Sequence, residues 1–256
     1  MINFNSALDE FLRYTEQFKK NPKIDIKRKH SLRVMKNCEK LAVYLGLNNK
    51  EIELAKLIGL LHDIGRFEQI NKYNTFLDRN SVNHAELGIK ILFDDNKIRN
   101  FIQTNQYDNL IRTSILNHNY REISNDIRDD KILLYCKIIR DADKIDIYPV
   151  VIDDGIENAV VFEIDDISKE NLTCEIMKDC LNHKSCRKEY MKTNIDCIVV
   201  WISYIYNLNF NYSLKIIKDN NYIDKMINLV NYKNENTYGA MQKIRFNVHE
   251  YINSKV

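Results

Sequence analysis

Two neighbouring residues, His62 and Asp63, have side chains that can bind metal ions or move protons. They stand within a largely apolar segment, residues 52–67. A buried carboxylate is costly unless it is paired, hydrogen-bonded or bound to a metal ion. The pair therefore predicts a polar partner or a metal ion, held by residues from elsewhere in the chain.

Further histidine and aspartate side chains share apolar stripes at helical spacing, which places them on the buried faces of separate helices. These residues are His30, His84, His118 and Asp143. A single histidine on an apolar face is usually a core residue, but repetition on several helices is hard to explain by packing alone. Imidazole and carboxylate donors without thiolate suit one or two divalent transition-metal ions, namely Fe, Mn, Co, Ni or Zn. A ligand set completed by water leaves a catalytic position open.

The elements that must position these residues are expected to be helices. The chain of 256 residues has only 6 Gly and 2 Pro, which favours an all-α fold. Asn21 and Pro22 are typical of a helix start, and Gly46 of a helix end. We expect helices near residues 3–20, 22–45, 52–67, 81–91, 108–119, 129–147, 168–181, 192–208, 212–231 and 237–253.

The remaining pattern concerns loops and domains. Residues 68–80 are predicted to be a polar and aromatic loop that lines or covers a pocket, and Pro149 is predicted to end its helix. We find no repeat and no linker rich in Pro, Gly or Ser. We therefore predict one compact domain, 1–256, with a core at about 22–150 and a C-terminal helical extension at about 151–256.

Composition limits the classes of partner. The chain has 38 basic and 36 acidic residues, so a strongly basic face for nucleic acid is not expected. The N-terminus does not read as a signal peptide, and the apolar run at 198–206 is too short to span a membrane. The six cysteines form no C-x-x-C pair, which suits free thiols in the cytoplasm. The pattern does not set the oligomeric state.

The ordered set H…HD…H…H…D resembles the HD-domain superfamily of metal-dependent phosphohydrolases. The resemblance covers about residues 22–150 and includes the stretches L-L-H-D-I-G-R at 60–66 and D-A-D-K-I-D at 141–146. It implies an HD-domain helical bundle. It also implies that one metal ion is bound by His30, His62, Asp63 and Asp143. His84 and His118 would bind a second ion, with Asp63 bridging, or phosphate where only one ion is present.

The same resemblance implies a reaction, the hydrolysis of a phosphate ester or anhydride in a small nucleotide or metabolite. A metal-bound hydroxide would attack phosphorus. Lys144, next to Asp143, is an implied phosphate contact, with a solvated lysine as the alternative. Arg66 lies one turn from His62 and can reach the same pocket, with a surface ion pair as the alternative. The predicted catalytic residues are Asp63, Lys144 and Arg66, and the predicted substrate contacts are Lys144, Arg66, His84, His118, Arg79 and Tyr73.

Two other functions share this ligand set. The HD-fold diiron oxygenases also use four histidines and two aspartates, and a non-catalytic sensor could bind a nucleotide in the same core. The filled ligand positions argue against a decayed site. The sequence departs from the HD-GYP subgroup, because it has no G-Y-P stretch and Asn119 rather than histidine follows His118. A cyclic dinucleotide is therefore a poor substrate candidate.

Overall fold

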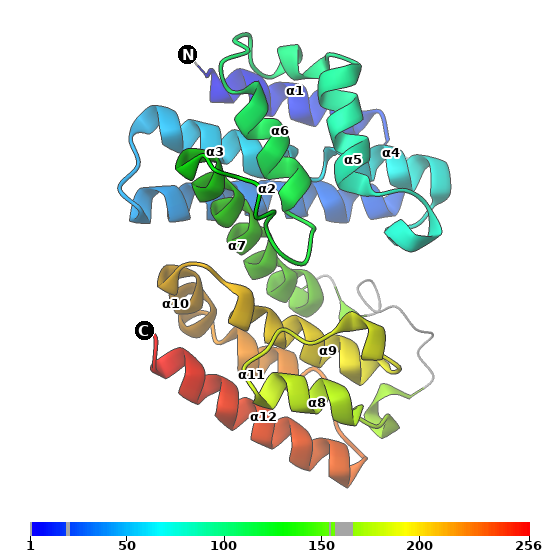
Figure 1. Cartoon of the computed structure of the whole chain (residues 1–256). Helices are drawn as coiled ribbons and strands as arrows, with labels where there is room; N and C mark the ends of the chain where they lie inside the picture. The colour runs from blue at the N-terminus through cyan, green and yellow to red at the C-terminus, as the bar shows by residue number, and fades with distance from the viewer. Residues whose placement is uncertain (1, 19–20, 154, 157–165) are drawn as a thin grey trace. The chain divides into compact units, whose positions relative to one another are not determined.

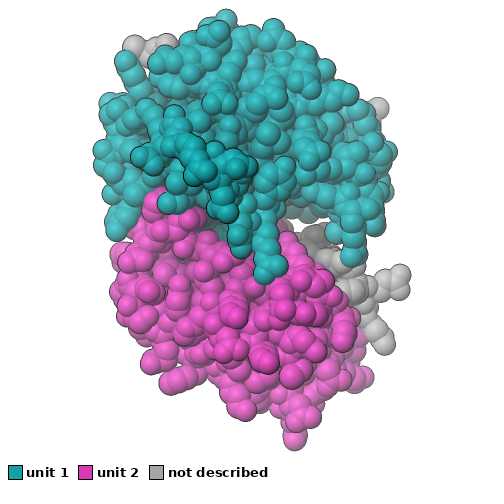
Figure 2. Space-filling model, in the orientation of Figure 1, with its two compact units in different colours: residues 1–146 teal, residues 147–256 magenta. Residues whose placement is uncertain are grey.

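The computed structural model describes residues 2–18, 21–153, 155–156 and 166–256. Within these ranges the regular structure is helical and contains no strand, so the predicted all-α fold is confirmed (Figure 1). The chain divides into two compact units, residues 1–146 and 147–256 (Figure 2). The grouping of the whole chain into one domain stays a prediction. In the described residues, no helix is long and apolar enough to cross a membrane.

The first unit contains the predicted site. Its helices are α1 (Phe4–Glu16), α2 (Pro22–Tyr44), α3 (Asn49–Leu61), α4 (Ile64–Tyr73), α5 (His84–Ile89), α6 (Asp108–Asn117) and most of α7 (Asp130–Asp153). Short 3-10 or π turns lie at Asp78–Asn80, Lys90–Asp94 and Lys97–Asn100. Helix α2 packs along α3, and α4 packs against α5. These two pairings bring the histidine-bearing segments together.

The second unit is a helical cluster with its own apolar core. Its helices are α8 (Cys174–Leu181), α9 (Asn194–Ile202), α10 (Asn211–Asp219), α11 (Tyr222–Ile227) and α12 (Glu235–Asn253). Short 3-10 turns lie at Ile167–Lys169, Lys188–Tyr190 and Ser203–Asn207. One long helix was expected over 212–231, but the chain turns at Asn221, whose φ is +52°, and forms α10 and α11 instead.

Helix α2 begins and ends where the sequence predicts. The Asn21 side-chain oxygen accepts a hydrogen bond from the backbone N–H of Lys23 at 3.0 Å, and Pro22 is the first helical residue. Gly46 follows the helix with a φ of +71°, a conformation that glycine adopts without steric cost. The helix carries His30 at its buried face.

The continuous helix expected over 52–67 is wrong, because the chain breaks at His62 and Asp63. The Nδ1 atom of His62 lies 2.8 Å from the Gly59 carbonyl oxygen. In a continuous helix that oxygen would accept from the backbone N–H of Asp63. Asp63 instead has φ −105° and ψ 18°, and α4 starts at the next residue. A side chain therefore takes the place of a backbone hydrogen bond and ends α3.

The spacing of four residues between Gly59 and Asp63 predicts that the missing side chain leaves room for the carboxylate, but the structure gives Gly59 another role. A Cβ atom added at Gly59 would lie 2.8 Å from Cys38 Sγ and 3.0 Å from Met35 Cα, both on α2. The missing side chain allows α2 and α3 to approach each other closely. The glycine serves the helix contact rather than the carboxylate.

Two predicted boundaries also differ from the structure. Helix α4 continues to Tyr73 and ends at Asn74, whose φ is +51°, so the first part of the predicted 68–80 loop is helical. Pro149 does not end α7, which continues to Asp153. Tyr148 is buried in the core of the second unit, and its hydroxyl donates to the Trp201 carbonyl oxygen at 3.3 Å. This packing holds the last turn despite the N–H that proline lacks.

We predict that Gly65→Ala disrupts the contact between α4 and α5. The added Cβ would lie 2.1 Å from the His84 carbonyl oxygen and 2.6 Å from the Gly88 nitrogen, and backbone atoms cannot rotate away. Such overpacking costs about 1–3 kcal/mol or more. In urea unfolding, Gly239→Ala is the control, because its Cβ meets nothing within 4 Å and should be neutral or stabilising. An unchanged free energy of unfolding in Gly65→Ala would contradict this packing.

A second prediction concerns pH and the second unit. Asp179 is buried, and Arg187 donates to it from Nε at 2.9 Å and Nη2 at 2.8 Å, which lowers the pKa of the carboxyl. A lowered folded-state pKa stabilises the fold above the unfolded pKa of about 4, and this stabilisation is lost as pH falls. Asp179→Asn should therefore be less stable than wild type at pH 7, and the difference should shrink in acid.

Chemical unfolding at several pH values tests this. Asp219→Asn is the matched control, because Asp219 pairs with Lys215 at 2.9 Å but is 54% exposed, and it should change little at any pH. An equal deficit of Asp179→Asn at pH 7 and in acid would refute the linkage.

Candidate metal centre

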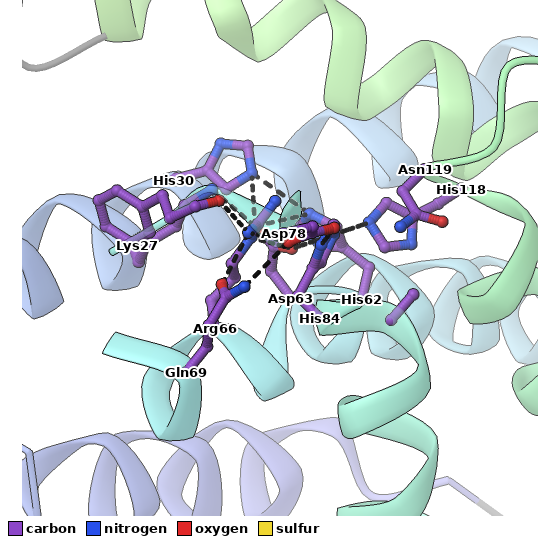
Figure 3. Close-up of polar contacts among 12 residues, drawn as sticks. Lys27, His30, His62, Asp63, Arg66, Gln69, Asp78, His84, His118 and Asn119 are labelled. Carbon is purple, nitrogen blue, oxygen red and sulfur yellow. Dashed lines mark hydrogen bonds and ion pairs between the residues drawn. The ribbon is translucent and has the colours of Figure 1, made fainter. Parts of the chain in front are cut away.

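Six predicted ligand residues from separate helices converge in the first unit, and Figure 3 shows most of them. They are His30 on α2, His62 and Asp63 at the junction of α3 and α4, His84 at the start of α5, His118 at the end of α6 and Asp143 on α7. All except Asp143 are buried, and Asp143 is half-buried. The structure thus places together residues that lie more than a hundred positions apart in the chain.

The imidazoles meet in two pairs. The Nε2 atom of His30 lies 3.2 Å from that of His62, and also 3.2 Å from Asp143 Oδ1. The Nε2 atom of His84 lies 3.1 Å from that of His118. The two pairs adjoin, because the rings of His62 and His118 are 5.0 Å apart.

Asp63 lies between the two pairs and offers one carboxylate oxygen to each. Its Oδ2 atom is 3.4 Å from His30 Nε2 and 3.7 Å from His62 Nε2. Its Oδ1 atom is 3.3 Å from His84 Nε2 and 3.7 Å from His118 Nε2. We call His30, His62, Asp143 and Asp63 Oδ2 the first cluster. We call His84, His118 and Asp63 Oδ1 the second cluster.

Backbone carbonyl groups hold two of the rings. The Nδ1 atom of His62 faces the Gly59 oxygen at 2.8 Å, and that of His118 faces the Ile115 oxygen at 2.6 Å. A carbonyl oxygen can only accept, so Nδ1 must carry the proton in both rings. In the neutral imidazole this leaves a lone pair on Nε2, which is the atom directed into the centre.

Carboxylates hold the other two rings. His30 Nδ1 lies 2.8 Å from Asp146 Oδ2, and His84 Nδ1 lies 2.7 Å from Asp78 Oδ2. Arg33 donates to Asp146 at 2.8 Å. Such carboxylate–histidine pairs orient the ring and increase the basicity of the nitrogen that binds a metal ion.

Asp78 is itself fixed by its neighbours. Its Oδ1 atom accepts from Arg66 Nη1 at 2.7 Å and from Gln69 Nε2 at 2.9 Å. Arg66 also donates to the Phe76 carbonyl oxygen at 2.6 Å. The guanidinium therefore connects α4 to the segment that follows it, and keeps Asp78 aimed at His84.

The end of α6 is held by a buried cation. The Arg140 guanidinium donates to the carbonyl oxygens of Asn117 at 2.7 Å, Tyr120 at 2.5 Å and Arg121 at 2.7 Å. A positive charge is favourable at a helix C-terminus, where carbonyl groups lack helical partners. Arg140 thereby secures the turn that carries His118.

The electrostatics differ between the clusters. Burial alone would lower the pKa of His30, but hydrogen bonds to Asp143, Asp146 and Asp63 raise it to about 10. Burial lowers the pKa of His84 to about 4, against the effect of Asp78. Burial opposes the charged form of Asp63, yet Lys27 and the imidazoles hold the pKa of that carboxyl well below its usual range.

These donors fit divalent metal ions. Two neutral imidazoles cannot hold Nε2 lone pairs about 3 Å apart without a proton or a cation between them. Two compact ligand groups stand out in the described part of the chain: His30 with His62 and Asp143, and His62 with Asp63 and His118. Nitrogen and oxygen donors without thiolate suit a transition-metal ion.

The predicted substrate contacts have different positions. Arg66 lies beside the centre, with Nε 3.7 Å from Asp63 Oδ1, and its other contacts are those to Asp78, Gln69 and Phe76. Lys144 is half-buried on α7, directly after Asp143. Tyr73 and Arg79 are exposed, and within the described residues no hydrogen bond or ion pair links either of them to the converging side chains. Their roles stay predictions.

Sequence reasoning missed several residues of the centre. Lys27 Nζ lies 2.7 Å from Asp63 Oδ2, one helical turn before His30, and Asp146 lies one turn after Asp143. Helical spacing could have identified both. Asp78 lies in a short 3-10 turn outside any periodic segment, so no comparable signal pointed to it.

Comparison with known families agrees with this geometry. A family model described as HD domain matches residues 28–148, a range that contains all six converging residues and both orienting carboxylates. No curated protein and no solved structure matches the chain. Residues 28–148 are therefore similar to an HD domain, the family of metal-dependent phosphohydrolases that the sequence motifs resemble.

Proposed function

We propose that this protein hydrolyses a phosphate ester or anhydride of a small nucleotide or metabolite with the help of two divalent transition-metal ions. The observation that carries the proposal is the position of Asp63. Its two oxygens face two separate imidazole pairs at 3.3–3.7 Å. A carboxylate in this position is suited to bridge two cations.

The first ion would be held by His30, His62, Asp143 and one oxygen of Asp63. The second would be held by His84, His118 and the other oxygen of Asp63. When bound, such ions act as Lewis acids and lower the pKa of a coordinated water molecule. Asp146 and Asp78 keep the rings of His30 and His84 oriented for this role.

The substrate approaches where the centre is open. His62 and Asp63 are nearly inaccessible, with side chains 0% and 4% exposed, whereas Asp143 is 31% and Lys27 20% exposed. A phosphoryl group that enters there would place its negative oxygens near the ions and the ammonium group. Lys144, beside Asp143, is proposed as a further phosphate contact.

An HD-fold diiron oxygenase is the second candidate, because the same four imidazoles and two carboxylates suit a pair of iron ions. It predicts two iron ions per chain and oxygen consumption with a polyol or phosphonate. A nucleotide sensor, the third candidate, predicts binding without turnover. Metal analysis of protein purified without chelator, followed by a phosphate-release screen with Mn, Co, Ni and Fe, separates the three.

We predict that Asp63→Ala abolishes both metal binding and turnover, because each cluster loses an oxygen donor. Metal content by mass spectrometry and phosphate release with small phosphate esters measure the two effects. Circular dichroism controls for folding. Asp9→Ala, which removes an exposed carboxylate on α1, should behave like wild type. Unaltered activity of Asp63→Ala would remove the assignment.

A further prediction separates the two ions. Asp78→Asn removes the carboxylate that orients His84, and loss of such a partner costs roughly 10–100-fold in metal affinity. The affinity for one of the two ions should fall, as in His118→Ala, while the other ion stays bound. Asp146→Asn is the matched comparison, because it acts on His30 in the first cluster. Calorimetric titration with Mn²⁺ measures both, and loss of both ions in Asp78→Asn would show that the ligands are divided differently.

A further inference from the structure

One lysine donates a short hydrogen bond to the bridging carboxylate. Lys27 Nζ lies 2.7 Å from Asp63 Oδ2, and 5.4 Å from the centre of the Phe76 ring. Figure 3 shows Lys27 reaching Asp63 from the side of His30. The lysine side chain is 20% exposed and the aspartate 4%, so the ammonium group lies between the buried carboxylate and the solvent.

The same oxygen belongs to the first cluster. Asp63 Oδ2 is 3.4 Å from His30 Nε2 and 3.7 Å from His62 Nε2. A divalent ion held by these nitrogens and this oxygen would lie close to the ammonium group. Two cations that share one carboxylate oxygen repel each other, so the lysine and the ion compete for it.

Lys27 can move away from Asp63, whereas hydrogen bonds fix the neighbouring arginines. Arg66 is bound to Asp78, Gln69 and the Phe76 carbonyl oxygen, and Arg33 donates to Asp146. Lys27 has a flexible stem of four carbon atoms and a compact charge. Its partly exposed position lets the ammonium group move toward the open side of the centre.

We propose that Lys27 is a substrate-contacting residue with two partners. In the metal-free protein its ammonium group neutralises Asp63. Once a metal ion binds Asp63 Oδ2, the ammonium group moves and donates to a phosphoryl oxygen of the substrate. The proposal rests on the proposed function and adds a residue to it. The ammonium group exchanges one oxygen anion for another, and no covalent bond changes. The Phe76 ring, whose backbone carbonyl group accepts a hydrogen bond from Arg66, offers the ammonium group a favourable surface in its present position.

Lys27→Met tests the proposal, because it keeps the stem and removes the charge. Mn²⁺ affinity, measured by titration calorimetry, should rise several-fold because the competitor is gone. The affinity of the Mn²⁺-loaded protein for inorganic phosphate should fall about tenfold or more, as expected for a lost charge-assisted hydrogen bond. Lys27→Arg should retain most of the phosphate affinity.

Lys23→Met is the matched control. Lys23 lies one turn earlier on α2 and donates to the Asn74 carbonyl oxygen at 3.1 Å, away from Asp63. Lys23→Met should change neither the Mn²⁺ affinity nor the phosphate affinity. If Lys27→Met folds normally but binds Mn²⁺ no more tightly, or binds phosphate as well as wild type, the proposal is overturned.

The two proposals fail separately. If wild type hydrolyses a phosphate ester and Lys27→Met does so with the same KM, Lys27 has no substrate role while the proposed function stands. If wild type hydrolyses none under any metal, the proposed function is overturned. The Mn²⁺ and phosphate titrations still decide the role of Lys27 in that case.

Discussion

The structure of the first unit depends on one buried charge, the carboxylate of Asp63. A carboxylate that is 4% exposed costs several kcal/mol in desolvation unless other groups compensate. Here four imidazoles and one ammonium group surround its two oxygens. These groups come from four segments, because His30 and Lys27 share α2. Compensation of this single charge therefore requires α2, α5 and α6 to meet at the junction of α3 and α4.

The helix break makes this meeting possible. Because His62 takes the Gly59 carbonyl oxygen through its side chain, α3 ends and both His62 and Asp63 reach the centre. Gly59 lets α2 approach α3, and Gly65 lets α5 approach α4. The glycines are therefore placed where the backbone must come close, and the polar residues are placed where it turns.

Periodicity predicted the converging residues well, because helical spacing decides which face a side chain shares. His30, His118 and Asp143 were identified in this way, and the structure brings His30 to Asp143 and His118 to Asp63. Periodicity could not reveal the break at Asp63, since competition between a side chain and the backbone leaves no repeat in the sequence. Pro149 was misjudged for a related reason, because the packing of Tyr148 in the second unit outweighs a local preference.

The two clusters are alike in donors but not in charge. His30 in the first cluster faces Asp63, Asp143 and Asp146, and these carboxylates raise its pKa to about 10. His84 in the second cluster faces Asp63 and Asp78, yet burial prevails and its pKa falls to about 4. Three carboxylates thus surround His30 and two surround His84, so the first cluster carries the larger negative charge. Lys27 lies on that side, which is where a movable cation can both compensate the excess of carboxylates and meet an incoming phosphoryl group.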